Sequence, residues 1–278
     1  MGSMQRLIAL SCAAGMAAAC GASPAVLQQL VETRRVASQM HVAFASAADA
    51  SNRAVMADTD ETSATAVDEA KQAREAIEKD LDTLAATLRS VGYTEDQRAL
   101  AAFKTHFEEY RQVDDEILPL AVENTNLKAQ RLAFGPAQQA ARELAATLDA
   151  ATRTAKNSCC AEALAGKTRA ALLEIQVLQA PHIAESEDAA MTKLENRMQE
   201  LAKTARAAVD ELKAPAAAAA LDRFMAINAE IVALSRRNSN VRSLALSLGR
   251  KRMITAECEA DLIALEQALA RHTFSATR

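Results

Sequence analysis

Aromatic and turn-forming residues are scarce in this sequence. Its 278 residues include no Trp, 2 Tyr and 6 Phe, with only 7 Gly and 5 Pro. β-Strands are normally rich in β-branched and aromatic residues and are bounded by turn residues, and no such pattern recurs here. Ala, Leu, Glu, Gln, Lys and Arg, which favour helices most strongly, are abundant throughout. The sequence therefore predicts an all-α protein.

Long apolar runs and an excess of positive charge are also missing. No segment approaches the ~20 consecutive apolar residues that a transmembrane helix needs. The 32 basic and 36 acidic residues leave a formal net charge of −4. That balance lacks the basic patch typical of proteins that bind nucleic acid, so we expect no nucleic-acid partner.

Motifs for catalysis and for metal binding are absent from the sequence as well. It contains no Gly-x-Ser-x-Gly, no Gly-rich phosphate loop and no His-Glu-x-x-His. The four histidines form no Glu-x-x-His pair of the kind used by di-iron bundles, and the cysteines lack zinc-site spacing. We therefore expect no enzymatic activity, no metal and no cofactor. A haem or metal carrier remains a weaker alternative.

The N-terminal 23 residues read as a tag followed by a signal segment. Arg6 precedes an apolar and small-residue stretch, Leu7 to Ala19, as in secretory signals. Cys20 then follows three alanines, which resembles the cleavage box of bacterial lipoproteins, in which this cysteine is lipidated. We expect a lipid-anchored protein of the periplasm or cell envelope. Plain secretion and a chain that is not exported are the alternatives.

Three cysteines lie beyond the signal segment. Cys159 and Cys160 are adjacent in sequence, and adjacent cysteines rarely bridge each other. Cys258 reads as a small core residue. A disulfide from Cys159 or Cys160 to Cys258 is the alternative.

Apolar residues recur every three or four positions from about Val26 onward, as in the helices of a bundle. Helix boundaries are marked by two capping boxes, Asp58–Glu61 and Thr94–Gln97, and by Gly92 and Gly135-Pro136. The expected helices are 25–57, 60–91, 95–133, 136–157, 159–184, 186–213, 216–247 and 250–273. Such short connections are typical of antiparallel neighbours.

The two halves of the chain repeat each other. The stretch around Asn124 returns around Asn238, and Gly135 returns as Gly249, both at an offset of 114 residues. Each half then holds four helices in the same order. The sequence predicts two tandem up-and-down four-helix bundles, one from residues 24–157 and one from 158–278, after the tag and signal segment 1–23.

The repeated stretches resemble the four-helix-bundle sensor domain of bacterial methyl-accepting chemotaxis receptors. The residues that carry this resemblance are Asn124-Thr125-Asn126-Leu127-Lys128-Ala129 with Leu132 to Ala137, Asn238 to Gly249, and Asn52-Arg53-Ala54-Val55. The resemblance covers about residues 26–157 and 159–273. It implies an extracytoplasmic bundle that senses small molecules, often as a dimer. It does not extend to the membrane spans or the signalling region of those receptors.

The principal candidates for ligand binding are five residues. Asn124 and Asn238 lie on the apolar stripe of the third helix of each half, where a buried amide either fixes the packing register or faces a ligand. Arg53, Arg131 and Arg242 could pair with an anionic ligand, because a guanidinium matches a carboxylate, and the basic run Arg250-Lys251-Arg252 offers the same chemistry. Ion pairs on a solvated helix face are the alternative.

These observations predict a lipid-anchored, chemoreceptor-like helical protein that binds a small molecule or a partner protein of the envelope or a signalling system. A homodimer is one expected assembly, and the membrane is expected to be contacted only through the lipid. The alternative is a structural scaffold or spacer of the cell envelope without a ligand. An inter-helix cavity would favour the first, and a core filled by Ala and Leu the second.

Overall fold

The computed structural model describes residues 24–272, and within this range every regular element is helical. The all-α prediction is thus confirmed. The elements are α1 Pro24–Met56, α2 Asp60–Val91, α3 Thr94–Glu123, α4 Thr125–Phe134, α5 Pro136–Thr154, α6 Ser158–Ala184, α7 Asp188–Leu212, α8 Pro215–Arg237, α9 Ser239–Leu246, the π-helical turn η1 Ser247–Lys251 and α10 Arg252–Arg271.

Most of the expected helix ends are found where the local sequence signals place them. The box expected at Asp58–Glu61 forms one residue later, where Thr59 caps α2 in a reciprocal capping box with Thr62. Gly92 ends α2 in the left-handed conformation with φ 74°. The second expected box, at Thr94–Gln97, is wrong. Tyr93 is the N-cap of α3 without a side-chain bond, and the Gln97 amide instead donates to the Leu88 carbonyl at the end of α2.

Asn124 and Asn238 interrupt the third helix of each half, which the sequence predicts to be continuous. Both adopt left-handed backbone conformations, with φ 49° at Asn124 and φ 54° at Asn238. An L-residue in this conformation ends an α-helix, and Asn tolerates it better than most because its short side chain can bond locally. The expected helices 95–133 and 216–247 are therefore each two helices.

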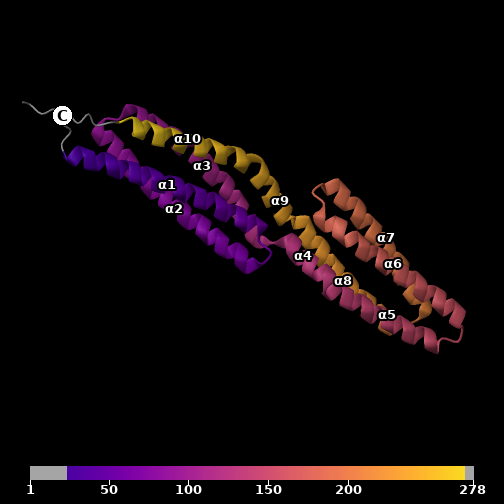
Figure 1. Ribbon diagram of the computed structural model, residues 1–278. Helices are drawn as coiled ribbons and strands as arrows, with labels where there is room; N and C mark the ends of the chain where they lie inside the picture. The colour runs from indigo at the N-terminus through magenta and orange to yellow at the C-terminus, as the bar shows by residue number, and fades with distance from the viewer. Residues whose placement is uncertain (1–23, 273–278) are drawn as a thin grey trace, which may run out of the picture.

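Two hydrophobic cores organise the molecule, and Figure 1 shows the corresponding bundles one after the other along its length. The first core is formed by α1, α2, α3 and α10, and the second by α4, α5, α6, α7 and α8. Phe44, Phe103, Phe107 and Tyr110 stack edge to face or in parallel within the first core, which thus holds the main aromatic cluster.

The two sequence repeats exchange their fourth helices. The prediction that 24–157 and 158–278 form separate bundles is wrong, because α5 packs on α6 and α8 whereas α10 packs on α1 and α3. An up-and-down bundle needs a reversal between its third and fourth helices. Here the chain passes Asn124 and Gly135 without reversing, and α3, α4 and α5 follow one another from one bundle into the other (Figure 1).

Polar contacts fasten α10 to the first bundle. The Arg34 guanidinium on α1 donates to the carbonyls of Leu269 and His272 at 2.8 and 2.9 Å, which satisfies the free carbonyls at a helix end. His106 on α3 lies 2.6 Å from Asp261 on α10, and this hydrogen bond raises the pKa of His106. The last helix of the chain therefore closes the bundle that the first helix begins.

We expect this exchange to be visible in matched core variants. Leu148 in α5 and Leu262 in α10 are fully buried residues at equivalent positions of the two repeats. Leu→Ala at either should lower the free energy of unfolding by about 2–5 kcal/mol. Hydrogen exchange should accelerate in α1–α3 for Leu262→Ala and in α6–α8 for Leu148→Ala. Faster exchange in α6–α8 for Leu262→Ala and in α1–α3 for Leu148→Ala would instead mean that each bundle is formed by one repeat alone.

Candidate functional site

The two repeats meet at a polar crossing, which we define as residues 124–126 and 238–240. The backbone N–H of Thr125 donates to Ser239 Oγ at 3.0 Å, and the backbone N–H of Ser239 donates to Thr125 Oγ1 at 3.0 Å. Each hydroxyl thus satisfies a free N–H at the start of the other repeat's helix. These bonds join positions 114 residues apart, the same offset as the sequence repeat.

Asparagine side chains form further reciprocal hydrogen bonds between the two repeats. The N–H groups of Asn126 and Asn240 each donate to the other's Oδ1 at 3.1 Å. The Asn126 amide also donates to Asn238 Oδ1 at 2.7 Å, and the Asn240 amide to Asn124 Oδ1 at 2.8 Å. Five of the six residues of the crossing are buried and Asn240 is half-buried, so most of these amides exchange water for a partner in the opposite repeat.

The crossing also holds the first interhelical loop of each repeat. Asn124 Nδ2 donates to Asp60 Oδ1 at 3.2 Å, beside the α1–α2 loop. Asn238 Nδ2 donates to the Glu185 carbonyl at 2.8 Å in the α6–α7 loop. A displacement of either loop would therefore move the Asn124 or Asn238 amide, which also bonds to the other repeat.

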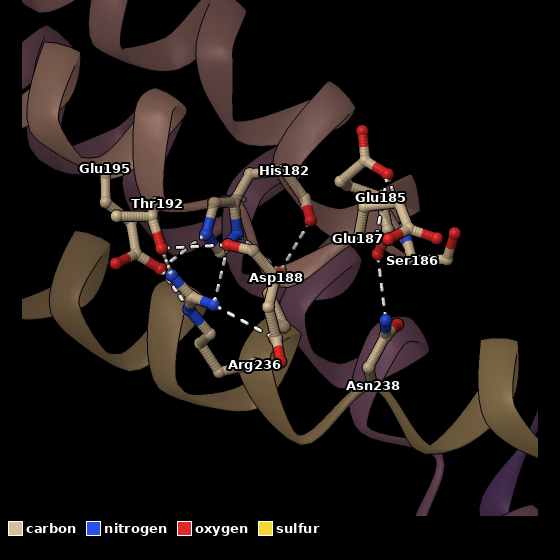
Figure 2. A network of polar contacts seen from close by, with 10 residues as sticks. His182, Glu185, Ser186, Glu187, Asp188, Thr192, Glu195, Arg236 and Asn238 are labelled. Atoms are coloured by element: carbon tan, nitrogen blue, oxygen red, sulfur yellow. Dashed lines mark hydrogen bonds and ion pairs between the residues drawn. The ribbon is translucent and has the colours of Figure 1, made fainter. Parts of the chain in front are cut away.

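A charged network adjoins the crossing in the second bundle (Figure 2). His182, at the end of α6, lies 2.7 Å from Ser235 Oγ and 2.8 Å from Glu195 Oε1. Arg236 at the end of α8 donates to Glu195 and to Asp188. Its guanidinium is the main reason that the pKa of Glu195 is lowered, with His182 adding to the effect. The network joins α6, α7 and α8 next to Asn238.

The first bundle buries a second charged group, the Lys251 cluster, which comprises Ser51, Arg74, Asp114 and Lys251. Lys251 Nζ donates to Asp114 Oδ1 at 2.8 Å and to Ser51 Oγ, and lies 5.1 Å from the centre of the Tyr110 ring. The Lys251 side chain is 2% exposed and that of Asp114 is fully buried. Burial lowers the pKa of Lys251, and Asp114 opposes this shift.

A groove of about 390 Å³ opens beside the Lys251 cluster. It lies between the end of α1 and the segment from α9 to α10. The groove is lined by Asn52, Val55, Met56, Leu244, Ser247, Leu248, Lys251, Arg252, Thr255, Ala256 and Glu259. The helix beside it is interrupted by η1, in which Gly249 has the non-helical angles φ −92° and ψ −105°. The equivalent residue of the first repeat, Gly135, also breaks its helix, with φ −114° and ψ −88°.

The second bundle has no comparable charge at the equivalent place. Ala137 occupies the position of Lys251 in the other repeat, and Asn228 that of Asp114. Asn228 accepts a hydrogen bond of 2.9 Å from the Gln179 amide, so a neutral amide pair stands where the first bundle has an ion pair. The two copies therefore share a fold but differ in the chemistry of one buried layer.

The five sequence-predicted ligand residues do not form a single site. Asn124 and Asn238 are brought together in the crossing, and Arg131 donates to the Asp58 carbonyl in the adjacent α1–α2 loop at 2.7 Å. Arg53 lies on the outside of α1, where it pairs with Asp49 and Glu69, and Arg242 is an exposed residue of α9.

Sequence reasoning missed Thr125, Ser239 and the burial of Lys251 with Ser51, Arg74 and Asp114. It found Lys251 only as part of the basic run Arg250-Lys251-Arg252. The signal for the cluster was available: Asp114 interrupts the apolar stripe of α3, and Lys251 stands where the first repeat has a buried alanine.

The structure supports the interpretation of Cys258 as a core residue and shows no disulfide from Cys159 or Cys160 to Cys258. Cys258 is a buried core residue, and burial raises the pKa of its thiol to about 12. Cys159 and Cys160 are exposed at the start of α6, and all three thiols are free. Cys20, the predicted lipidation site, lies outside the described residues. Within residues 24–272 no cluster of three or more His, Cys, Asp or Glu side chains is arranged to hold a metal ion.

Comparison with known families gives a match. A family model described as "four helix bundle sensory module for signal transduction" matches residues 28–170, just over half of the chain. No curated protein matches the chain. The matched range covers α1 to α5, which form the first sequence repeat and not the first packed bundle, and it extends into the start of α6. No helix in the described part of the chain is both long and apolar enough to span a membrane.

The crossing should show energetic coupling between the repeats. Asn126→Ala and Asn238→Ala each remove one partner of a buried hydrogen bond, and their combined loss of unfolding free energy should depart from additivity by about 1 kcal/mol. Chemical denaturation of the single and double variants measures this. Asn126→Ala with Asn157→Ala, which removes the distant cap of α6, is the additive control. Additive behaviour in both pairs would contradict the crossing.

Glu195 should make stability depend on pH in the acid range. Because its pKa is lowered in the folded state, its contribution is fully present above the ordinary Glu value and is lost as pH falls through the folded value. Glu195→Gln should therefore lower the melting temperature at pH 6–7, and the difference from wild type should shrink below about pH 4. A difference that stays constant over this range would exclude Glu195 as the titrating group.

Proposed function

Because the chain belongs to the family of four-helix-bundle sensory modules for signal transduction, we propose that it is an extracytoplasmic sensor that binds a small ligand in its first bundle. In this role, a partner protein recognises the ligand-bound state of the chain. No enzymatic step is part of the proposal. The proposed location rests on the sequence of the signal segment, and the anchor on lipidation of Cys20.

The buried Lys251 cluster beside the open groove carries this proposal. A buried ion pair contributes little net stability compared with apolar residues of similar volume. The second bundle does without one, since it has Ala137 and Asn228 at the same places. A spacer would have no need for charge in this layer, whereas a ligand site benefits from polar groups that are already oriented.

The lining of the groove indicates the class of ligand. Arg252 and Glu259 place one cation and one carboxylate at its rim, and Met56 and Leu248 provide apolar surface. A guanidinium binds a carboxylate, and a carboxylate binds an ammonium group. The chemistry fits an amino acid or a small organic acid with a short apolar side chain. Of the predicted ligand residues, Asn124, Asn238 and Arg131 then serve to relay the signal, and Arg53 and Arg242 remain surface candidates.

A structural scaffold is the competing function, and the crossing favours it. The crossing joins the two bundles by reciprocal hydrogen bonds between buried groups, as expected for a stiff rod. The two functions differ in whether the groove has an occupant.

A thermal-shift screen of the full chain with amino acids and organic acids tests the proposal. A ligand at a hundred times its Kd stabilises the folded state by about 2.7 kcal/mol, which corresponds to roughly 5–10 °C in a chain of this size. Arg252→Ala and Glu259→Gln should abolish the shift. Arg250→Ala, an exposed neighbour that does not line the groove, should retain it. No shift with any compound, or equal shifts in all variants, would favour the scaffold.

A further inference from the structure

A hollow of about 190 Å³ lies between α2 and α3, near the turn at Gly92 that joins them. We call it the α2–α3 hollow. Leu81 and Leu100, two of the residues that line it, are buried members of the first core, so one side of the hollow is apolar. None of its lining residues belongs to the groove beside Lys251, so it is a separate place on the first bundle.

The second repeat has a corresponding hairpin, formed by α7 and α8. Gly92 and Lys213, both in the left-handed conformation, end α2 and α7, and they lie 121 residues apart. This offset exceeds the 114 residues found at the crossing because α3 has 30 residues and α8 has 23, a difference of about two helical turns. At the offset of 121, Phe103 corresponds to Phe224, and both are fully buried. Near their turns, the two hairpins can therefore be compared position by position.

An ion pair closes the equivalent place in the second bundle. Arg206 on α7 pairs with Asp222 on α8 and so bridges the two helices. The residues at these positions in the first bundle are Ala85 and Ala101, and both line the hollow. An alanine side chain ends at its Cβ and has no polar atom, so it cannot bridge two helices. The α2–α3 hollow is thus open where the second hairpin is sealed.

Two cations without ion-pair partners flank the hollow. Arg89 lies in the last turn of α2 and Lys104 lies inside α3, and both are exposed. Neither forms an ion pair with any described residue, whereas Arg111, further along α3, pairs with both Glu78 and Glu108. Side chains on a helix lean toward its N-terminus, and α2 and α3 run in opposite directions, so the two cations lean toward each other.

This pair of cations is a property of the first hairpin alone. Asp210 and Met225 occupy the positions equivalent to Arg89 and Lys104 in the second hairpin. The negative end of the helix dipole accounts for a cation at Arg89, but it does not account for Lys104. Guanidinium and ammonium groups both bind phosphate through charge-assisted hydrogen bonds. Asp82 adds one carboxylate to the lining, which suits an ammonium group next to such a phosphate.

The hollow lies toward the end of the first bundle at which α1 begins and α10 ends (Figure 1). Gln29, near the start of α1, donates to Ser90 Oγ at the end of α2, over 3.0 Å. His272, just after α10, stacks on Tyr93 with ring centres 3.8 Å apart. Cys20 lies four residues before the start of α1, and four residues span at most about 14 Å. A lipid on Cys20 would therefore hold this end of the bundle close to the membrane.

We propose that the α2–α3 hollow binds the phosphoethanolamine headgroup of a membrane phospholipid. Arg89 and Lys104 bind the phosphate, and Asp82 accepts hydrogen bonds from the ammonium group. The site goes beyond the sensor role proposed above, and only the membrane source of its ligand rests on the lipid anchor of that role. A lipid on Cys20 attaches the chain at one point, and a bound headgroup would add a second point on α2 and α3.

Co-sedimentation of the full chain with vesicles tests the site, with Cys20→Ser so that the chain carries no lipid of its own. Vesicles of phosphatidylcholine with phosphatidylethanolamine should bind more chain than phosphatidylcholine alone. Arg89→Ala with Lys104→Ala should weaken this additional binding about tenfold or more, because each cation loses a charge-assisted hydrogen bond. Lys79→Ala with Arg98→Ala removes the same charge from exposed residues of α2 and α3 outside the hollow and should bind like wild type. Equal weakening in both variants would overturn the site.

Closing the hollow without changing the net charge is a second test. Ala85→Arg with Ala101→Asp introduces the ion pair that bridges the second hairpin, so it should abolish headgroup binding without lowering the melting temperature. An unchanged affinity would place the headgroup elsewhere and overturn the proposal. Neither residue lines the groove beside Lys251, so the thermal shift expected with amino acids should persist in this variant. Failure of one site is thereby distinguished from failure of the other.

Calorimetric titration with soluble phosphoethanolamine separates two sources of the same chemistry. Tighter binding to the vesicles than to the soluble compound would support the lipid, because the membrane presents the headgroup at the end of the bundle. Binding to the soluble compound alone would overturn the membrane as its source. Absence of binding to both would overturn the site itself.

Discussion

Two asparagines in the left-handed helical conformation control the course of the whole chain. Asn124 and Asn238 end α3 and α8 without reversing them, and the helices that follow begin with N–H groups that their own repeat does not satisfy. Hydroxyl and amide oxygens of the opposite repeat accept those N–H groups. Each repeat therefore depends on the other to complete its helix starts. Once the third helix continues past this point, its fourth helix lies in the other bundle, and the exchange of α5 and α10 follows.

The sequence predicts where the helices begin and end better than it predicts which helices pack together. Gly92 and Gly135-Pro136 mark helix ends through local backbone chemistry, and apolar spacing marks the buried faces, so both can be found from nearby residues alone. The offset of 114 residues between Asn124 and Asn238 also reveals the repeat. Whether a fourth helix packs on its own repeat or on the other one is a different question. Both fourth helices present an apolar face, around Leu148 in α5 and Leu262 in α10, and the direction of the chain at the crossing places each face in the other repeat's bundle.

The candidate site was harder to predict for a related reason. Charged residues such as Asp114 and Lys251 look like surface residues in a charged helical sequence, and their burial depends on which helices meet. Ser51, Asp114 and Lys251 come from α1, α3 and α10, so they assemble only because the fourth helix is exchanged. Had α10 stayed with its own repeat, Lys251 would have met Asn228 and Gln179, and no carboxylate would have balanced its charge. The exchange and the charged layer of the first bundle therefore depend on each other.

This dependence gives the molecule a short path between its two bundles. Residues 239–251 run directly from the crossing to Lys251 and contain the π-helical turn η1. A ligand beside Lys251 can shift an equilibrium only by the difference in its affinity for two arrangements. The kink at Gly249 lies within this segment, and a change in its backbone angles would rotate α9 relative to α10. Rotation of α9 would act on Ser239 and Asn240, whose partners start α4 in the second bundle. The same segment thus ends at a buried cation on one side and at the bonds between repeats on the other.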